Sequence, residues 1–246
     1  MTMSAPKMFV SPSIGAGRHQ TYTDLMNSEV EIKEPAAGKN FMQLKISGSL
    51  KNYIQLPASV TLPMGAIRNS NDTGEVRLKT LVSLNTDNPD CEELIKALNY
   101  IDDQVTLKIK ESIVLSKKPC FKKDMTRIIK TNPDRPPSFY MRIEPQRGSL
   151  PGSEIYNKET NEKLEFESLA PPPEKDFGGI LTQARGDVIA RIAYAWMHPS
   201  TGYGIAVVLH KAKVSLNSVE EIDFMVDEED EEEDGMNMTS GATDFI

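Results

Sequence analysis

Residues 76–91 read VRLKTLVSLNTDNPDC and place two structural periods one after the other. From Val76 to Leu84, apolar and polar side chains alternate, which is typical of a strand with one buried face. The alternation stops at Asn88-Pro89-Asp90, where asparagine suits a helix cap and proline suits the first helical turn. These residues predict a half-buried strand that leads into a helix.

Apolar residues recur at helical spacing beyond this cap. The stripe consists of Leu94, Ile95, Leu98, Ile101, Val105 and Ile109. Glu92 and Glu93 stand in the first turn, where negative charge interacts favourably with the helix dipole. We expect one long helix that ends before Pro119 and buries the apolar stripe.

Further segments with period two lie on both sides of the helix. The expected strands are 41–46, 53–56, 76–84 and 139–143, a hairpin over 155–166, and two long strands, 187–197 and 203–214, around Pro199–Gly202. Trp196 and Tyr194 share the phase of Ile192, so Trp196 is predicted to be a core residue. Strands interrupted by one helix predict a mainly β fold, namely an OB-like β-barrel with an inserted α-helix.

Charge divides the chain into a basic body and an acidic end. The 246 residues include 36 acidic and 28 basic side chains, a net charge of −8. From Val214 onward there are 12 acidic and no basic residues, which leaves +4 in the preceding body. The eight consecutive carboxylates of Asp227–Asp234 repel one another and predict a disordered acidic C-terminal tail. The expected parts are a polar N-terminal arm over 1–34, an OB-like domain over 35–216 and this tail over 217–246.

Several functional classes lack support in the sequence. The apolar runs are too short to span a bilayer and the first residues do not resemble a secretion signal, so no membrane association is expected. Cys91 and Cys120 fit neither a disulfide framework nor a zinc site and indicate an intracellular, reducing compartment. The three histidines lie far apart, and no phosphate-binding loop or nucleophile motif occurs. We therefore expect no enzymatic activity, no metal site and no cofactor.

Positive charge is concentrated between Lys108 and Arg147. This segment contains 11 basic and 4 acidic residues, a net charge of +7. Such a segment attracts phosphates, and aromatic residues within it offer rings on which bases stack. No helix is patterned for a major groove, so the combination favours single strands over duplex. The predicted nucleic-acid-binding residues are Lys45, Arg77, Lys79, Lys117, Lys118, Phe121, Lys122, Lys123, Arg127, Lys130, Arg135, Tyr140 and Arg142.

Strand phase supports part of this set. Phe139 is in phase with Met141 and Ile143, which predicts a core position, whereas Tyr140 and Arg142 share the opposite face. The polar sides of the other strands carry Lys45, Arg77 and Lys79. Lysine pairs on loops are usually ordinary solvated surface. Spacing alone leaves open whether these faces line one groove.

The acidic tail ends in an aromatic residue. Its predicted partner-binding residues are Asp227, Glu228, Glu229, Asp230, Glu231, Glu232, Glu233, Asp234, Asp244, Phe245 and Ile246. An exposed aromatic beside a carboxylate suits docking on another protein, whereas a tail for solubility alone does not need one. A tethered tail of this charge can also compete with DNA for a basic groove of the same molecule.

The order of these features resembles the OB-fold single-stranded DNA-binding proteins of tailed phages and large DNA viruses. Four elements carry the resemblance: the strand and helix start of 76–91, Phe121-Lys122-Lys123, the closing hairpin over 186–209, and the acidic tail with a terminal aromatic. The tails of that family often end on phenylalanine, whereas Ile246 follows Phe245 here.

The resemblance implies a protein that coats single-stranded DNA during viral DNA replication, recombination and repair. It implies that the tail recruits a replicative DNA polymerase and a helicase or primase, at the site of viral replication in the host nucleus or cytoplasm. The sequence does not define the oligomeric state and is compatible with a homodimer. The alternatives are an acidic-tailed chaperone or structural interaction protein without DNA binding, and an enzyme of nucleotide metabolism with an unrecognised site.

Overall fold

The computed structural model describes residues 22–35, 41–47, 52–58, 60–70, 76–146, 152–172 and 174–216. The acidic tail and residues 1–21 of the predicted arm lie outside these ranges. The strands are β1 (Val30–Lys33), β2 (Phe41–Ile46), β3 (Tyr53–Gln55), β4 (Thr61–Leu62), β5 (Ala66–Ser70), β6 (Val76–Ser83), β7 (Met125–Thr126), β8 (Lys130–Asn132), β9 (Arg135–Ile143), β10 (Glu154–Asn157), β11 (Lys163–Leu164), β12 (Phe177–Gly178), β13 (Ala184–His198) and β14 (Gly202–Ser215). The helices are α1 (Tyr22–Met26), α2 (Pro89–Glu111) and α3 (Phe166–Leu169), with 3-10 turns η1 (Leu115–Lys117) and η2 (Pro119–Lys122).

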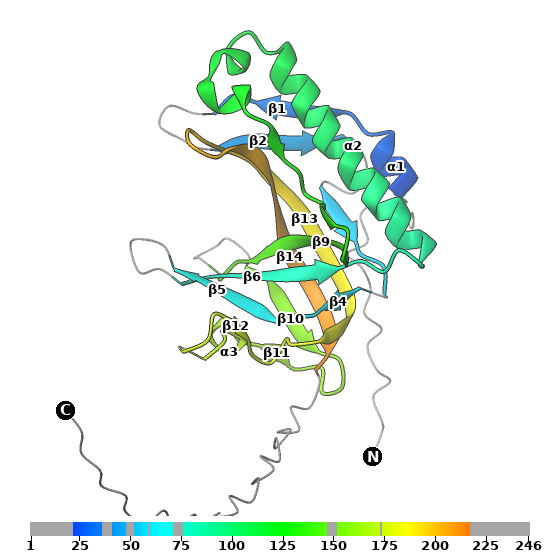
Figure 1. The fold of residues 1–246 in the computed structure, drawn as a ribbon. Helices are drawn as coiled ribbons and strands as arrows, with labels where there is room; N and C mark the ends of the chain where they lie inside the picture. Colours follow the sequence, from blue (N-terminus) through cyan, green and yellow to red (C-terminus); the bar gives the residue numbers. More distant parts are fainter. Residues whose placement is uncertain are drawn as a thin grey trace, which may run out of the picture.

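Five strands close into a ring (Figure 1). β13 pairs with β4, β4 with β6, and β6 with β9; β9 then pairs in parallel with β14, which returns to β13. The other strands extend this ring, with β2 and β3 on β13, β1 on β2, and β10 on β14. The predicted mainly β, OB-like barrel with an inserted helix is confirmed.

The alternation along β6 and β9 puts apolar side chains inside the barrel. The inward pairs are Leu78–Ile143, Thr80–Met141 and Val82–Phe139, and all six side chains are buried. Because cross-strand partners share a face, the intervening pairs, which include Lys79 and Arg142, point outward. The phase read from the sequence for Phe139 and Tyr140 is therefore confirmed.

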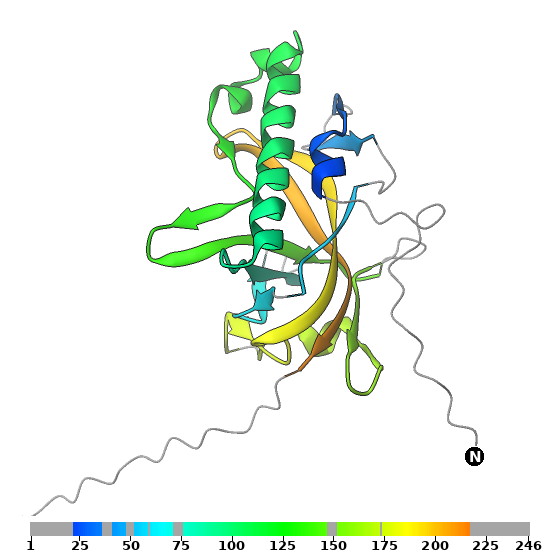
Figure 2. The same ribbon diagram turned by 90° about the vertical axis from the view of Figure 1, so that its right-hand side faces the viewer.

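α2 forms where the cap and the apolar stripe predict it. Asn88 caps the helix by accepting a hydrogen bond from the Asp90 backbone N–H at 2.9 Å. Five of the six predicted stripe residues are fully buried, and Ile95 packs beside them. The helix packs against α1 and β1, which Figure 2 shows at its side. Leu25 and Val30 are buried there, so this part of the predicted N-terminal arm belongs to the folded domain.

α2 also holds the segment that leads into β8. The Asp102 carboxylate is buried and accepts a hydrogen bond from the Ile128 backbone N–H at 2.9 Å. Its other oxygen has no hydrogen-bond partner among the described residues. Burial raises the pKa of Asp102 to about 7, although the Ile128 N–H and the nearby Arg127 charge act in the opposite direction. Arg127 itself pairs with Asp103 at 2.6 Å.

The pairing of β13 with β14 is irregular at two points. At the first, between Ile189 and Ala190, the extra residue is His210 on β14, and at the second, between Ile192 and Tyr194, it is Ala193 on β13. After the second bulge Ala195 is buried, whereas Tyr194 and Trp196 lie on the outward side. The prediction that Trp196 is a core residue is therefore wrong. The extra residue reverses the phase that Trp196 would share with Ile192 in an unbroken strand.

The described ranges contain no helix that could cross a membrane. In the same ranges, no group of three or more histidine, cysteine or acidic side chains could hold a metal ion. Cys91 and Cys120 are both free cysteines with buried side chains.

Candidate nucleic-acid interface

The outward side of β6 and β9 carries a lysine on a tyrosine ring. Lys79 Nζ lies 4.8 Å from the centroid of the Tyr140 ring. Tyr140 remains 44% exposed, so one face of its ring is available for another contact. A cation against one ring face orients the ring and adds positive charge beside it.

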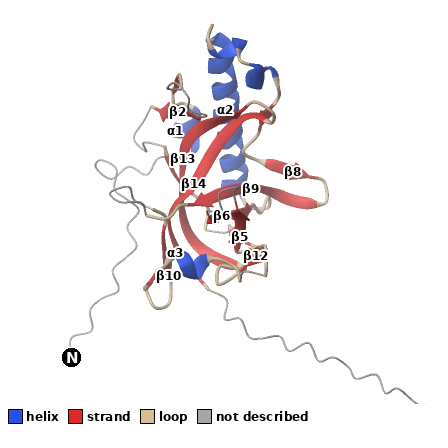
Figure 3. Ribbon diagram, turned by 90° about the vertical axis from the view of Figure 1, so that its left-hand side faces the viewer, coloured by secondary structure: helices blue, strands red, loops and turns tan. Residues whose placement is uncertain are grey.

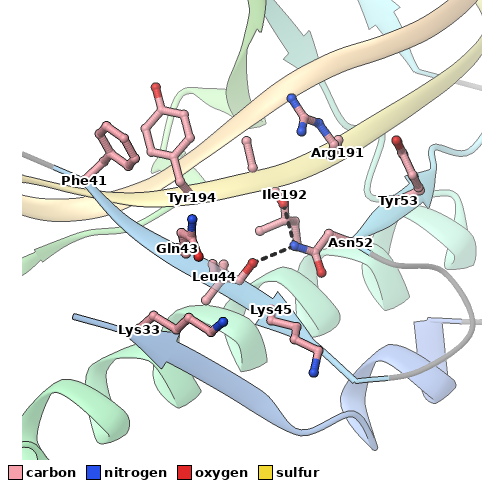
Figure 4. A pocket seen from close by; sticks show the side chains of 11 residues that line it. Lys33, Phe41, Gln43, Leu44, Lys45, Asn52, Tyr53, Arg191, Ile192 and Tyr194 are labelled. Carbon is pink, nitrogen blue, oxygen red and sulfur yellow. Dashed lines mark hydrogen bonds between the residues drawn. The ribbon is translucent and has the colours of Figure 1, made fainter. Parts of the chain in front are cut away.

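A second pair links β9 to β13 across β14. The Arg142 guanidinium donates a hydrogen bond to Tyr194 Oη, and its carbon lies 5.5 Å from the ring centroid. The Tyr194 ring in turn lies 5.7 Å from the ring of Phe41 on β2, tilted by 56°. Figure 4 shows the rings of Phe41 and Tyr194 next to each other. Phe41 is 44% exposed, which is unusual for a phenylalanine in a strand.

β14 lies between these pairs and carries small residues on its outward side. The core positions of β14 include Tyr203, Ile205 and Val207, so the residues between them face outward. Those residues are Gly204, Ala206 and Val208. Their small size leaves room for Arg142 to reach Tyr194 over the strand. We call the surface formed by Phe41, Lys79, Tyr140, Arg142, Tyr194 and Trp196 the outer face.

Part of the predicted binding set meets on the outer face or beside it. Lys79, Tyr140 and Arg142 belong to it, and Arg77 precedes Lys79 on the same side of β6. Lys45 follows Phe41 on the outward side of β2 and pairs with Glu31 at 3.4 Å.

Other predicted residues lie beyond the end of α2. Lys117, Lys118, Lys122 and Lys123 surround η1 and η2. Lys123 donates a hydrogen bond to the backbone oxygen of Ser200, in the turn between β13 and β14. This basic group is therefore located at one end of the two long strands.

Phe121 lies within the same basic group but packs toward the core. Its ring meets the ring of Tyr203 edge-on, with 5.0 Å between the centroids. Phe121 is half-buried in this arrangement. Its predicted role as a stacking platform stays a prediction.

The hairpin of β8 and β9 carries two further predicted cations. Figure 3 shows this hairpin projecting away from the barrel. Lys130 pairs with Ser138 in register, which places it on the same side as Tyr140. Arg135 is exposed near the tip. Arg127 differs from both because its guanidinium is paired with Asp103 on α2.

Sequence reasoning missed Phe41, Tyr194 and Trp196. The signal for Phe41 was present, because it alternates with Met42 and Leu44 on the side that carries Lys45. An aromatic residue on the polar side of a strand favours a surface role. The signal for Tyr194 and Trp196 was hidden, since a bulge cannot be read from the alternation of β13.

Gly204 on β14 packs directly against the ring of Trp196 in the outer face. A Cβ at this position would lie 2.7 Å from the Trp196 ring and 2.8 Å from the Thr126 backbone oxygen. We expect Gly204→Ala to displace the Trp196 ring. Trp196 is the single tryptophan of the chain, so its emission maximum reports the displacement directly. Ala206→Gly is the control; an unchanged emission maximum in Gly204→Ala would contradict the packing described.

No protein-family model and no curated protein sequence match the chain. Solved structures are similar to it at low identity. The single-stranded DNA-binding protein of bacteriophage Enc34 in complex with ssDNA has 16% identity and a TM-score of 0.35, covering 77% of this chain and 96% of that chain. Another structure of the Enc34 protein has 17% identity and a TM-score of 0.35, over 81% and 98%. The single-stranded DNA-binding protein gp2.5 of bacteriophage T7 has 11% identity and a TM-score of 0.42, over 71% and 97%. At values this low, a similar chain path does not establish a shared function.

Proposed function

We propose that the protein binds single-stranded DNA along the outer face. The observation that carries the proposal is the repeated pairing of a cation with a tyrosine ring on one sheet surface, Lys79 with the exposed Tyr140 and Arg142 with the half-buried Tyr194. Rings stack with any base and cations attract phosphates, so such pairs bind single strands with little sequence preference. A strand surface of this kind suits unstacked bases better than the groove of a duplex.

Within this proposal, the protein coats single strands during viral DNA replication, recombination and repair. The basic group around η1 and η2 extends the path of the strand beyond the outer face. The tail residues Asp227–Asp234 and Asp244–Ile246 recruit the polymerase and the helicase or primase. Their charge and terminal aromatic support this role, which takes place at an intracellular site of viral replication.

The test is a titration of the full-length protein with fluorescent oligo-dT of about 16 nucleotides, the upper end of OB-fold site sizes. Fluorescence anisotropy at several salt concentrations gives the affinity. The logarithm of the affinity is expected to fall with the logarithm of the salt concentration, with a slope of about 0.7 per phosphate contacted. Absence of binding at low salt, both in the full chain and in the tail variant below, would refute the proposal.

Neutralising the tail is expected to tighten binding. Replacing each residue of Asp227–Asp234 by its amide keeps the length of the chain and removes eight charges. The tethered acidic tail competes with DNA for the basic side chains of the same molecule. The affinity of the neutralised variant for oligo-dT should therefore rise by about tenfold or more at low salt. The gain should shrink as salt screens the charges. Equal affinities of the two proteins at low salt would contradict the competition.

The wild-type protein and the neutralised tail variant also distinguish single-stranded DNA binding from the alternative function. A chaperone or interaction module would bind basic proteins through the acidic tail and lose that binding in the neutralised variant. It would show no affinity for oligo-dT in either form.

A further inference from the structure

β13 pairs with β2 along one part of its length and with β3 along another, and a gap lies between these two paired parts. β2 pairs with Tyr194–Trp196, whereas β3 pairs with Ile189–Arg191. Neither register includes Ile192 or the bulged Ala193. β2 and β3 both run antiparallel to β13, and β3 is preceded by Asn52, whose φ of 73° lies in the left-handed region that asparagine tolerates.

Asn52 closes the floor of this gap. Its backbone oxygen accepts from the Ile192 N–H at 2.8 Å. Its side-chain amide donates to the Leu44 and Ile192 oxygens at 2.9 and 3.1 Å, and its side-chain oxygen accepts from the Ile46 N–H at 2.9 Å. These four hydrogen bonds join β2 to β13, so Asn52 ties the floor of the gap to both strands.

A hollow of about 490 Å³ lies over this floor (Figure 4). Its size falls within the roughly 300–1,000 Å³ that is common for small-molecule sites. The side chains that matter for binding around it are Lys33, Phe41, Lys45, Tyr53, Arg191 and Tyr194. It is therefore continuous with the outer face through Phe41 and Tyr194.

Aromatic rings stand on two sides of the hollow. Phe41 and Tyr194 form one side, and Figure 4 shows Tyr53 on the other. Tyr53 is held by the His210 ring behind it, with 4.5 Å between the centroids. Burial lowers the pKa of His210, which favours a neutral ring beside Tyr53. Aromatic rings that line a hollow favour a planar, unsaturated group inside it.

Cations surround the same hollow. Lys33 and Lys45 stand together on β1 and β2, and Arg191 lies above the floor on β13. Two carboxylates accompany them, Glu31 at 3.4 Å from Lys45 and Glu144 at 3.6 Å from Arg191. Three cations against two carboxylates leave net positive charge beside the rings. Rings plus positive charge match a group that has a planar base and a phosphate.

We propose that the hollow holds one nucleotide of the bound strand, an inference that rests on the proposed function. The base of this nucleotide is rotated away from the neighbouring bases of the strand, and it lies among the rings of Phe41, Tyr194 and Tyr53. Its phosphate lies at Lys33 and Lys45. The hollow thereby fixes one position of the strand, while the bases on the outer face remain on open platforms.

Photocrosslinking of the full-length protein tests the position of the base. Oligo-dT with 5-iododeoxyuridine at each position in turn is irradiated in the complex, and crosslinked peptides are identified by mass spectrometry. We expect crosslinks to Tyr53 in addition to crosslinks on the outer face. Tyr53 is the informative residue because it borders the hollow and is not part of the outer face.

Two hollow variants test its contribution to affinity. Tyr53→Leu keeps an apolar side chain against His210 and is expected to weaken oligo-dT binding roughly five- to 150-fold, the loss of one stacked base. Joint replacement of Lys33 and Lys45 by alanine should lower the salt slope by about 0.7, for the one phosphate that the two lysines contact. The matched control is joint replacement of Lys158 and Lys163 by alanine, since both are exposed on the β10–β11 hairpin.

The outcomes separate the inference from the proposed function. If oligo-dT binds with unchanged affinity in both hollow variants and Tyr53 gives no crosslink, the hollow is not a nucleotide site although the function stands. If the wild-type chain does not bind oligo-dT, both fail. If the hollow variants bind oligo-dT more tightly, and only while the acidic tail is charged, the tail occupies the hollow and the nucleotide assignment is overturned.

Discussion

Joint replacement of Tyr140 and Tyr194 by alanine is expected to weaken oligo-dT binding by about two to four orders of magnitude. Each ring provides one stacking platform, and each also holds a cation, Lys79 or Arg142, in place. Loss of a stacked base contributes about 1–3 kcal/mol per platform. The measurement is fluorescence anisotropy with the full-length chain, alongside circular dichroism to establish that the barrel is intact.

A tyrosine outside the outer face supplies the matched control. Tyr156 on β10 also has a lysine against its ring, with Lys211 Nζ 5.3 Å from the centroid. Tyr156→Ala therefore removes the same kind of pair from another part of the barrel and should leave oligo-dT affinity nearly unchanged. Equal losses from Tyr156→Ala and from the double variant would refute the outer face as the binding surface.

The second large effect concerns Asp102 and the pH dependence of stability. Burial raises its folded-state pKa from 3.8 to about 7. Between these two values the folded protein retains a proton that the unfolded chain releases, so the free energy of unfolding falls as pH rises through this window. A shift of this size corresponds to about 4 kcal/mol, fully lost above the folded-state pKa.

Asp102→Asn removes this dependence while keeping an oxygen for the Ile128 N–H. Urea unfolding at pH values from about 4 to about 8 measures it, because any constant penalty of the amide cancels when the two pH values are compared. The difference in unfolding free energy between wild type and variant should change by about 4 kcal/mol across the window. Glu92→Gln, at an exposed position in the first turn of α2, is the control. Parallel profiles of wild type and Asp102→Asn would contradict the burial effect.

The barrel could be predicted because its strands follow simple alternation and its helix has a complete start signal. In β6 the buried Leu78, Thr80 and Val82 are separated by single outward residues, so phase and burial agree. The cap at Asn88 is local chemistry and needs no tertiary information. The short helix α1 and strand β1 were not predicted as parts of the domain, because their burial depends on α2, which is distant in the sequence.

The binding surface could be predicted only where it depends on phase within one strand. Tyr140 and Arg142 emerged in this way. The neighbour of Arg142 on the surface is Tyr194, and the contact crosses β14. Such a contact is set by strand order, which the spacing of residues along the chain does not contain. Charge density was a weaker guide, since Arg127 falls in the basic segment yet pairs with Asp103.

The bulge at Ala193 keeps the aromatic residues on the outward side of a strand whose residue spacing would place them inside. Deleting this one alanine would put Tyr194 directly after Ile192 in a regular strand, so Tyr194 and Trp196 would stay on the outward side and Ala195 in the core. A change that instead forced Ala193 into the regular pairing would turn both rings toward the barrel interior. The reading frame of this strand, rather than the identity of its aromatic residues, thus decides which of its side chains can meet a ligand.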